Sequence, residues 1–376
     1  MVDIAVVGAG TMGAGIAESA ALAGMPVTML DVSEEVLERG RQTIERDLAR
    51  RVKKGRISEG ESEDVLGRVR TTISLGDLSG APLVVEAVVE DMDVKKKVFG
   101  DLEGVVRKGT VLATNTSSLS VASIASATAN PERVVGMHFF NPVPAMRLVE
   151  VVAGPSTNPE ALSRAEEVSG RLGKTPVRVS DTPGFIVNRV ARPFYLEALR
   201  IVESGGDPGQ VDAKIREAGF WMGPLELADL IGNDVNLSVS ESLFERYYYP
   251  PRFRPSYLQR SMVEAGALGR KSGRGFYDHA GDARYSGEEP PEDVALRVIS
   301  CIVNEAFLAV SEDVAAPEDI DRAMKLGANY PKGPFEWAEE IGPDRIVRTL
   351  DALRVTHGDA YLAAPLLRRR AQDVSA

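Results

Sequence analysis

The chain has 376 residues, enough for two or three domains, and its 44% hydrophobic and 26% charged residues are ordinary for a soluble globular protein. A formal charge of −11 argues against a nucleic-acid-binding surface, and the lack of a run of about eighteen apolar residues argues against a membrane span. The single cysteine, Cys301, excludes an internal disulfide framework, and no apolar signal segment precedes Val2, so we expect a cytoplasmic protein with no nucleic-acid or membrane partner.

Residues 1–180 alternate short β-branched runs with helical stretches, a pattern typical of a parallel sheet with crossover helices. Strands are predicted at Ile4–Val7, Val27–Leu30, Leu83–Ala87, Val111–Thr114, Val134–His138, Leu148–Val152 and Val177–Val179. The charged segment Glu34–Arg70 contains helix-forming residues but few large apolar ones, so we expect a helical hairpin that projects from the sheet. Asp181-Thr182-Pro183-Gly184 is then a boundary turn.

After Gly184 the chain becomes helical and contains an internal repeat. Apolar residues recur at helical spacing over 194–202 and again over 299–310. Matching motifs follow in the same order, first Leu196-Glu197-Ala198, Val211-Asp212, Gly223-Pro224-Leu225-Glu226 and Ile231-Gly232, then Asn304-Glu305-Ala306, Ile320-Asp321, Gly333-Pro334-Phe335-Glu336 and Ile341-Gly342. An irregular connection at roughly Tyr247–Glu289 separates the copies. We therefore predict an α/β Rossmann-type domain at 1–182, with the hairpin inserted at about 34–70, followed by two related all-α domains at 183–289 and 290–376.

The segment Gly8-Ala9-Gly10-Thr11-Met12-Gly13 follows the first predicted strand and leads into the helical stretch Ala14–Ala23. Gly8 permits a tight turn, Gly10 lets the backbone approach a pyrophosphate, and Gly13 allows close packing of helix on strand. The pyrophosphate then meets free N–H groups and the positive end of the helix dipole. Asp31 ends the second strand, where its carboxylate can accept hydrogen bonds from the adenosine ribose and repel a 2′-phosphate. The sequence therefore predicts NAD, and the alternative is a structural glycine-rich turn with an incidental acid. The predicted NAD-binding residues here are Gly8, Gly10, Thr11, Met12, Gly13 and Asp31.

His138 lies at the carboxyl end of a predicted strand, where open parallel sheets place their ligands. A histidine suits removal of a hydroxyl proton while hydride leaves the same carbon, because its unperturbed pKa is near neutrality. Glu150, on the next strand, could bind the other ring nitrogen and stabilise the imidazolium. The alternative is a core histidine with an unrelated surface glutamate. His279 and His357 lie in polar stretches without a paired acid motif and are expected at the surface.

Residues 1–285 resemble the 3-hydroxyacyl-CoA dehydrogenase family, including the short 3-hydroxybutyryl-CoA enzymes. Six motifs carry the resemblance and occur in the family's order: Gly8–Gly13, Val85-Glu86-Ala87-Val88-Val89-Glu90, Asn115-Thr116-Ser117-Ser118-Leu119, His138–Glu150, Asp181-Thr182-Pro183-Gly184-Phe185-Ile186-Val187-Asn188-Arg189, and Gly269-Arg270-Lys271-Ser272-Gly273-Arg274-Gly275-Phe276-Tyr277. They are spread over three quarters of the chain, which makes the match specific.

The resemblance implies a catalytic set. His138 would be the general base and Glu150 its orienting partner, while Ser117 and Asn188 would hydrogen-bond the substrate oxygens. Hydroxyl and amide groups can hold an acyl-CoA hydroxyl and thioester without adding charge. The alternatives are that Ser117 caps a helix and that Asn188 satisfies a helix start after the Pro-Gly turn.

The resemblance also extends the cofactor site. Asn141 would lie close to the nicotinamide, and Glu90, Lys95, Ser117 and Lys271 match positions that the family uses around NAD. Lys95 has the alternative of being one of three solvated lysines in a row. No metal site is predicted.

A basic cluster lies within the predicted hairpin of an otherwise acidic chain. Its members are Arg50, Arg51, Lys53, Lys54 and Arg56. In the family that this chain resembles, the hairpin contacts coenzyme A, whose phosphates need compensating charge. Lys54 is the best single candidate for that contact, and the alternative is a solvated helix face.

The short family members stop soon after the Gly-Phe-Tyr motif and dimerise through their single helical domain. This chain continues with a second copy, as do longer bacterial hydroxyacyl-CoA dehydrogenases and the dehydrogenase part of multifunctional fatty-oxidation proteins. Our hypothesis is that the two copies reproduce the dimer contact within one chain, which gives a monomer with an intramolecular pseudo-dimer, or else a homodimer. Val294–Ile299 corresponds to Phe185–Arg189 but lacks the asparagine, which favours a scaffolding role for the second copy.

The predicted function is reversible, NAD-linked oxidation of an (S)-3-hydroxyacyl-CoA, such as 3-hydroxybutyryl-CoA, to the 3-oxoacyl-CoA in fatty-acid β-oxidation. One alternative is a dehydrogenase of a free hydroxy acid, of the gulonate 3-dehydrogenase type, and the basic hairpin favours CoA over it. The other alternative is a non-catalytic NAD-binding scaffold of the lens-crystallin kind. The set of His138, Glu150, Ser117 and Asn188 argues against that scaffold.

Overall fold

The computed structural model describes residues 3–279 and 293–375. The chain divides into two compact units, Met1–Phe185 and Ile186–Ala376. The predicted order of a Rossmann-type sheet followed by a helical region is confirmed. Part of the expected connection Tyr247–Glu289, and with it the predicted boundary between the two helical domains, lies outside the described residues.

Within the described residues, the strands of the first unit form one eight-stranded sheet in the order β3-β2-β1-β4-β5-β6-β7-β8. The strands are β1 (Ile4–Val7), β2 (Val27–Leu30), β3 (Val69–Thr72), β4 (Leu83–Glu86), β5 (Val111–Thr114), β6 (Val134–Phe139), β7 (Leu148–Ala153) and β8 (Thr175–Ser180). The inner strands are continuous apolar runs because helices cover both faces of a sheet of this kind. The strand order reverses between β1 and β4, the point at which such sheets bind ligands.

Two features of the sheet differ from the predictions. The strand β3 was missed, because its alternating residues follow a helical segment and only Val69 is buried. The expected parallel sheet also contains one antiparallel pair, because β7 runs antiparallel to β6. The connection between β6 and β7, residues 140–147, has no helix and is shorter than the dozen residues that a parallel crossover needs.

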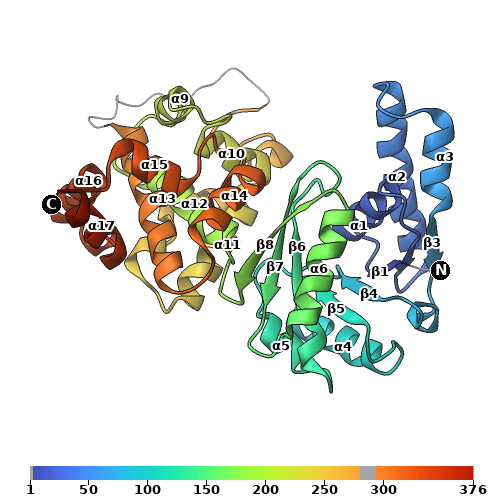
Figure 1. Cartoon of the computed structure of the whole chain (residues 1–376). Coiled ribbons are helices and arrows are strands. Elements are labelled where there is room, and N and C mark those ends of the chain that lie inside the picture. Colours follow the sequence, from blue (N-terminus) through green and yellow to red (C-terminus); the bar gives the residue numbers. More distant parts are fainter. Residues whose placement is uncertain (1–2, 280–292, 376) are drawn as a thin grey trace. The chain divides into compact units, whose positions relative to one another are not determined.

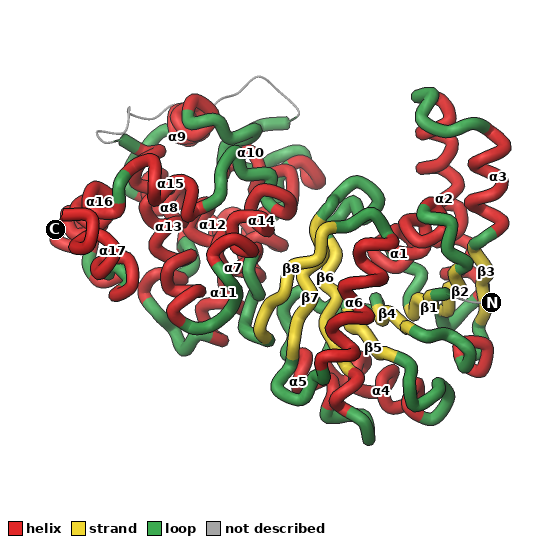
Figure 2. Tube along the Cα trace, viewed as in Figure 1, coloured by secondary structure: helices red, strands yellow, loops and turns green. Residues whose placement is uncertain are grey.

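The helices of the first unit are α1 (Thr11–Leu22), α2 (Glu34–Lys53), α3 (Glu59–Gly67), α4 (Met92–Glu103), α5 (Val121–Ala125) and α6 (Pro159–Arg171). The charged segment after β2 forms α2 and α3, which stand beyond the edge of the sheet as an antiparallel pair (Figure 2). Ser33 caps α2, and Ser58 caps α3 in a reciprocal capping box with Glu61. The main core lies between the sheet and helices α1 and α6, where small residues such as Ala17 and Ala20 allow close approach.

The second unit is helical in its described part (Figure 1). Its helices are α7 (Val187–Val190), α8 (Arg192–Glu203), α9 (Pro208–Glu217), α10 (Pro224–Ile231), α11 (Asn233–Arg246), α12 (Tyr257–Glu264), α13 (Val294–Ser311), α14 (Pro317–Gly327), α15 (Pro334–Ile341), α16 (Pro343–His357) and α17 (Pro365–Ser375). Proline occupies the first turn of many of these helices, where its missing N–H has no partner to lose.

The internal repeat predicted from the sequence is present in atomic detail. Asp212 accepts the backbone N–H groups of Leu225 and Glu226 at the start of α10, at 3.0 and 2.9 Å. Asp321 accepts those of Phe335 and Glu336 at the start of α15, at 2.8 and 3.3 Å. In each copy a glycine precedes the helix because an added Cβ would lie within about 2 Å of the aspartate, 2.2 Å for Gly223 and 2.1 Å for Gly333.

Two reciprocal ion pairs join the copies inside the second unit. Arg189 Nε of the first copy lies 2.7 Å from Glu305 of the second, and Arg297 Nε of the second lies 3.0 Å from Glu197 of the first. The arginines are 108 residues apart, as are the glutamates. All four side chains are buried. Such an exchange of equivalent contacts is the signature of a two-fold interface, here within one chain.

The helix α13 is long and apolar enough to cross a membrane by length and composition, but 67% of it is buried inside the unit. It packs against α8, α15 and α16 and carries the buried ion-pairing residues Arg297 and Glu305. These contacts are typical of the core helix of a helical domain.

Candidate active site

His138 and Glu150 form a buried pair on β6 and β7. The antiparallel register places the two residues opposite each other, and His138 Nδ1 lies 2.6 Å from Glu150 Oε2. Glu150 is fully buried, so it is not a surface residue, and His138 is only 6% exposed. Because a carboxylate accepts hydrogen bonds, this contact assigns the proton to Nδ1 and leaves Nε2 as the basic nitrogen. The arrangement suits a ring that takes up a proton.

Two aromatic rings stand beside the imidazole of His138. The Phe140 ring centre lies 4.4 Å away and that of Phe185 lies 5.7 Å away. Phe185 has a φ of 48°, a left-handed conformation that is uncommon for a bulky residue. Strained backbone of this kind clusters at functional sites, where the surrounding structure holds it in place. The tight turn at Gly184-Phe185 thus brings an apolar wall to the histidine.

The loop between β1 and α1 has the geometry of a dinucleotide site. Gly8 has a φ of 104°, and an added Cβ would lie 2.6 Å from the carbonyl oxygen of Ala87. At Gly13 an added Cβ would lie 1.8 Å from the carbonyl oxygen of Gly8, whereas at Gly10 it would meet nothing within 4 Å. Gly8 and Gly13 are therefore required for close packing, whereas Gly10 leaves the N-terminus of α1 open to a pyrophosphate. Thr11 and Met12 lie in the first turn of the helix, where Thr11 is exposed and Met12 is half-buried against the core.

Asp31 follows β2 and faces this loop. Its Oδ2 accepts the backbone N–H of Ala9 at 2.6 Å, and its Oδ1 accepts that of Val32 at 2.7 Å. Each carboxylate oxygen has a second lone pair, so the side chain can still accept a hydroxyl. The residues present therefore fit the adenosine half of NAD.

Glu90 organises the turn that carries Ser117. Its Oε1 accepts the hydroxyl of Thr116 at 2.7 Å and the backbone N–H of Ser117 at 2.8 Å, and the Ser117 hydroxyl lies 3.2 Å away. Burial of Glu90 opposes its ionisation, but Lys95 and these donors outweigh it and lower the pKa of the carboxyl. Helix α5 is capped by Ser120, so Ser117 is not a helix cap.

Lys95 is fully buried on α4 rather than solvated. Its Nζ lies 2.7 Å from Glu86 and 3.4 Å from Glu90. The sequence alternative of a solvated lysine is therefore wrong for this residue. Lys95 thus connects Glu86, at the end of β4, with Glu90, which in turn binds the Ser117 turn. The three predicted cofactor-site residues Glu90, Lys95 and Ser117 therefore belong to one network.

Asp181 and Asn115 hydrogen-bond backbone groups that follow Ser117 and His138 in the chain, but neither residue was predicted from the sequence as a site residue. Asp181 accepts the N–H groups of Val121 and Ala122 at 3.0 and 2.8 Å, and Asn115 Oδ1 accepts that of Phe139 at 2.8 Å. Both residues lie inside motifs of the resemblance, where their position next to the predicted site residues was the available signal.

The loop after His138 rests on the nucleotide-binding helix. An added Cβ at Gly15 of α1 would lie 2.9 Å from Val143, so this loop and α1 pack without space between them. Lys174, which is 9% exposed, donates from Nζ to the carbonyls of Val143 and Met146 at 2.5 and 2.8 Å. Asn141 is exposed on this loop. Lys174 thus fixes the segment that follows β6, and no sequence pattern pointed to it.

Comparison with known proteins decides the family. Residues 3–182 match the model of the 3-hydroxyacyl-CoA dehydrogenase NAD binding domain. Residues 184–279 and 294–374 match the C-terminal domain of 3-hydroxyacyl-CoA dehydrogenase. The chain belongs to the 3-hydroxyacyl-CoA dehydrogenase family. It is accordingly an NAD-dependent oxidoreductase that acts on the CH–OH group of a 3-hydroxyacyl-CoA.

Three relatives define the match. The chain is 37% identical to the 3-hydroxyadipyl-CoA dehydrogenase of Escherichia coli, over 98% of this chain and 97% of that protein. It is 45% identical to the 3-hydroxybutyryl-CoA dehydrogenase of Mycobacterium tuberculosis, over 73% of this chain and 98% of that one. A crystal structure of a 3-hydroxybutyryl-CoA dehydrogenase from Escherichia coli superimposes with a TM-score of 0.94 at 37% identity, covering 100% of this chain and 99% of that chain.

Two predicted site residues of this dehydrogenase belong to the second unit. Asn188 is half-buried in the short helix α7, whose N-cap is Ile186, so it is not the cap of that helix. Lys271 lies in the 3₁₀ turn Arg270–Ser272, and its Nζ is 2.6 Å from the carboxylate of Asp234. The other predicted residues lie in the first unit.

The five cations of the basic cluster differ in their contacts. Arg51 faces α1, where its Nε lies 3.3 Å from Glu18, and so it is not a freely solvated cation, while the exposed Arg50 lies 3.8 Å from Asp47 of its own helix. Lys53, Lys54 and Arg56 are exposed at the end of α2 and just beyond it, and these three form no ion pair with any described residue. They are the cations available to phosphate groups.

Glu18 carries a testable pH dependence. Burial, reinforced by Asp47, raises the pKa of the Glu18 carboxyl from 4.5 to about 8. Between these values the folded protein keeps a proton that the unfolded chain has lost, so stability falls as pH rises through this window. We expect the free energy of unfolding of the wild type to fall by about 3 kcal/mol more than that of Glu18→Gln between pH 5 and 8. Urea unfolding at several pH values measures this difference.

The control is Glu45→Gln on α2, where an exposed glutamate pairs with Arg41 at 3.2 Å. That variant should keep the wild-type pH dependence. A Glu18→Gln protein whose stability follows the wild-type curve over the same window would contradict the assignment.

Proposed function

We propose that this dehydrogenase oxidises short-chain (S)-3-hydroxyacyl-CoA thioesters, with His138 as the base that removes the hydroxyl proton. The observation that carries the proposal is the buried pair of His138 Nδ1 and Glu150 at 2.6 Å. With Nδ1 donating to the carboxylate, the ring presents Nε2 toward a substrate hydroxyl as a hydrogen-bond acceptor. When Nε2 takes the proton, the adjacent carboxylate stabilises the imidazolium that forms.

The loop at Gly8–Gly13 and Asp31 would hold NAD, which supplies the hydride acceptor when bound. Gly10 is the open position of that loop, with nothing within 4 Å of an added Cβ. Glu90 holds the backbone N–H of Ser117, and the Ser117 hydroxyl would turn from Glu90 to donate to a substrate oxygen. Asn141 would stand near the nicotinamide. Asn188 would hydrogen-bond a substrate oxygen, and Lys271 would bind NAD. These roles follow from matched family positions.

The acyl group is proposed from the relatives. The relative that spans the whole chain, including the second helical copy, is named for 3-hydroxyadipyl-CoA, and a shorter one for 3-hydroxybutyryl-CoA. We propose 3-hydroxyadipyl-CoA as the first substrate to test and 3-hydroxybutyryl-CoA as the second. We also propose that the protein is cytoplasmic and that it is a monomer. The proposal of a monomer rests on the reciprocal ion pairs of the second unit, which already supply a two-fold contact between its copies.

A substrate panel tests the proposal. We expect kcat/KM for the two CoA thioesters to exceed that for free 3-hydroxybutyrate by about 10³-fold or more, because binding energy from the CoA moiety is used at the reacting carbon. Rates of NADH formation at fixed NAD concentration give these values. Comparable values for ester and free acid would favour a dehydrogenase of free hydroxy acids instead.

Lys54→Ala isolates the CoA contact. It should raise KM for the thioesters by about tenfold and leave KM for NAD unchanged, since an exposed cation would be lost from a phosphate site. Lys97→Ala on α4 removes an exposed lysine of the same unit and should change neither constant. Equal effects of the two variants would contradict a specific CoA contact at the hairpin.

A further inference from the structure

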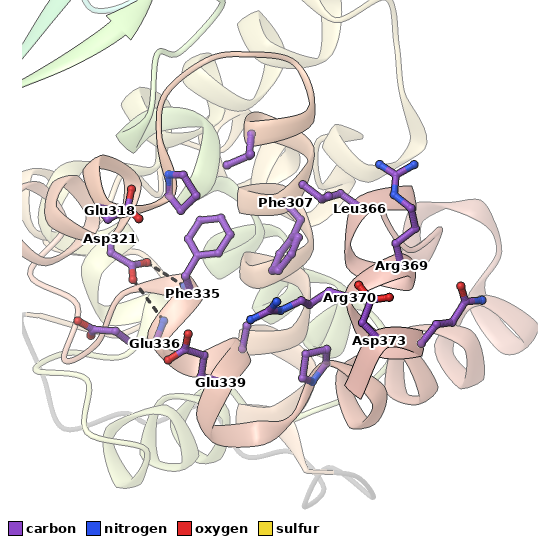
Figure 3. Close-up of a pocket in the computed structure, with 15 residues that line it drawn as sticks. Phe307, Glu318, Asp321, Phe335, Glu336, Glu339, Leu366, Arg369, Arg370 and Asp373 are labelled. Carbon is purple, nitrogen blue, oxygen red and sulfur yellow. Dashed lines mark hydrogen bonds between the residues drawn. The ribbon is translucent and has the colours of Figure 1, made fainter. Parts of the chain in front are cut away.

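A groove of about 770 Å³ lies in the second helical copy. The close-up in Figure 3 shows the rings of Phe307 and Phe335 at its floor, with Asp321 and Glu339 on one side and Arg370 on the other. The groove is formed by α13, α14, α15, the start of α16 and α17. All of these elements belong to the second unit, so the groove is defined within one body.

The internal repeat identifies what this groove corresponds to in the first copy. Asp321 is the counterpart of Asp212, because both cap the following helix through the same two backbone N–H groups. By the same alignment Pro317 corresponds to Pro208 and Glu339 to Asp229. All three groove residues therefore have counterparts whose surroundings are known.

In the first copy these counterparts bind the chain's own Gly-Phe-Tyr segment. Asp229 accepts the backbone N–H groups of Phe276 and Tyr277 at 2.9 and 3.0 Å. The Tyr277 hydroxyl donates to Asp212 at 2.5 Å and also lies 3.3 Å from the carbonyl oxygen of Pro208. Phe276 is only 1% exposed. The groove of the first copy is thus filled by an extended segment with two adjacent aromatic residues.

The same segment brings a further donor. His279 is exposed, as expected, but it has an acidic partner that the sequence pattern did not indicate, because its Nε2 lies 2.9 Å from Asp229. The signal was missed because Asp229 lies 50 residues earlier in the chain. Asp229 is 1% exposed, which requires that its carboxylate be fully hydrogen-bonded.

The second copy contains the acceptors without those donors. Asp321 accepts only the backbone groups at the start of α15, and Glu339 is exposed and forms no ion pair within residues 293–375. No described residue of the second copy corresponds to Phe276 or Tyr277. Carboxylates beside the half-buried ring of Phe335 suit an occupant with N–H or O–H donors and a ring.

We propose that this groove binds an extended segment of a partner protein that carries a Gly-Phe-Tyr-like sequence, in the way that the first copy binds its own Gly275–Tyr277. The tyrosine hydroxyl donates to Asp321 and the segment's backbone N–H groups donate to Glu339. The aromatic pair covers Phe307 and Phe335. Flanking charges fit as well, since the segment Arg274-Gly275-Phe276-Tyr277-Asp278 has a cation before the rings and an anion after them. The groove has Glu318, Glu336 and Glu339 on α14 and α15, and Arg369 and Arg370 beside Asp373 on α17.

A fluorescein-labelled peptide with the sequence of residues 273–278 is the probe, titrated with the full chain and followed by fluorescence anisotropy. We expect saturable binding that weakens about tenfold when the peptide tyrosine is replaced by phenylalanine, because one hydrogen bond to a carboxylate is lost. We expect a similar loss with Glu339→Gln in the protein. Dehydrogenase turnover should stay unchanged in that variant, so the result is independent of the proposed substrate.

The matched control is Glu340→Gln, which removes the same charge from the neighbouring exposed residue, one that pairs with Lys332 instead of lining the groove. It should bind the peptide as the wild type does. Absence of saturable binding at peptide concentrations up to about 1 mM, or equal affinity in the two variants, would overturn the proposal. Light scattering tests a second copy of the chain as the occupant. If the wild type is a dimer and Glu339→Gln dissociates it, the occupant is that second copy, and the proposal of a partner protein is overturned.

Discussion

His138→Gln is expected to lower kcat by about 10³-fold, because glutamine can hydrogen-bond a hydroxyl but cannot take its proton near neutral pH. NADH affinity should stay within about twofold of the wild type, since His138 is not among the predicted NAD contacts and the residues proposed for the pyrophosphate and the adenosine ribose lie at Gly8–Gly13 and Asp31. Acetoacetyl-CoA-dependent loss of NADH absorbance measures turnover, and NADH fluorescence measures binding. Retained NADH binding separates lost chemistry from a lost fold.

Two further variants make the comparison specific. His357→Gln places the same substitution at an exposed histidine in α16 and should leave kcat unchanged. Glu150→Gln keeps the shape of the buried pair but removes the charge that stabilises the imidazolium, and should lower kcat by at least about 10²-fold. Turnover of His138→Gln within tenfold of the wild type would remove His138 from the role of base.

Glu305→Ala is expected to lower the free energy of unfolding by about 3 kcal/mol, because it leaves two arginines without their buried partner. Glu305 is 2% exposed, and Arg189 and Arg252 lie 2.7 and 2.8 Å from its two oxygens. The pair with Arg189 joins the two helical copies, so the loss should appear in the unfolding of the second unit. Urea unfolding followed by tryptophan fluorescence suits this test because Trp221 and Trp337 both belong to that unit.

Glu312→Ala is the matched control, because Glu312 pairs with the same arginine but from a half-exposed position. Its Oε2 lies 2.8 Å from Arg189 Nη1, and its side chain is 42% exposed. An exposed pair contributes at most about 1 kcal/mol, so the control should be much less destabilised. Equal losses in the two variants would show that burial does not set the strength of this contact between the copies.

The sequence by itself determined the fold class, the NAD cofactor and the pairing of His138 with Glu150. Local spacing was sufficient for these features. The glycines at 8, 10 and 13 serve one turn, the apolar runs form single strands, and His138 and Glu150 lie on strands joined by a short loop. The internal repeat was likewise visible because its two copies keep small and turn residues in the same order. Patterns of this kind involve residues that lie close together in the chain. They can be recognised in the sequence because side chains recur on one face with the period of the helix or the strand.

Only the tertiary structure decided the contacts made across the fold. It placed Lys174 under the loop that follows His138, turned Arg51 away from solvent to Glu18, and joined the helical copies through Arg189 and Glu305. Each of these contacts joins residues at least 28 positions apart, and buried charges find partners by proximity in space. The same holds for the groove at Asp321. Its sequence motif corresponds to that of the first copy, and only the folded chain shows that the groove of the first copy is filled while the groove of the second offers its acceptors to solvent.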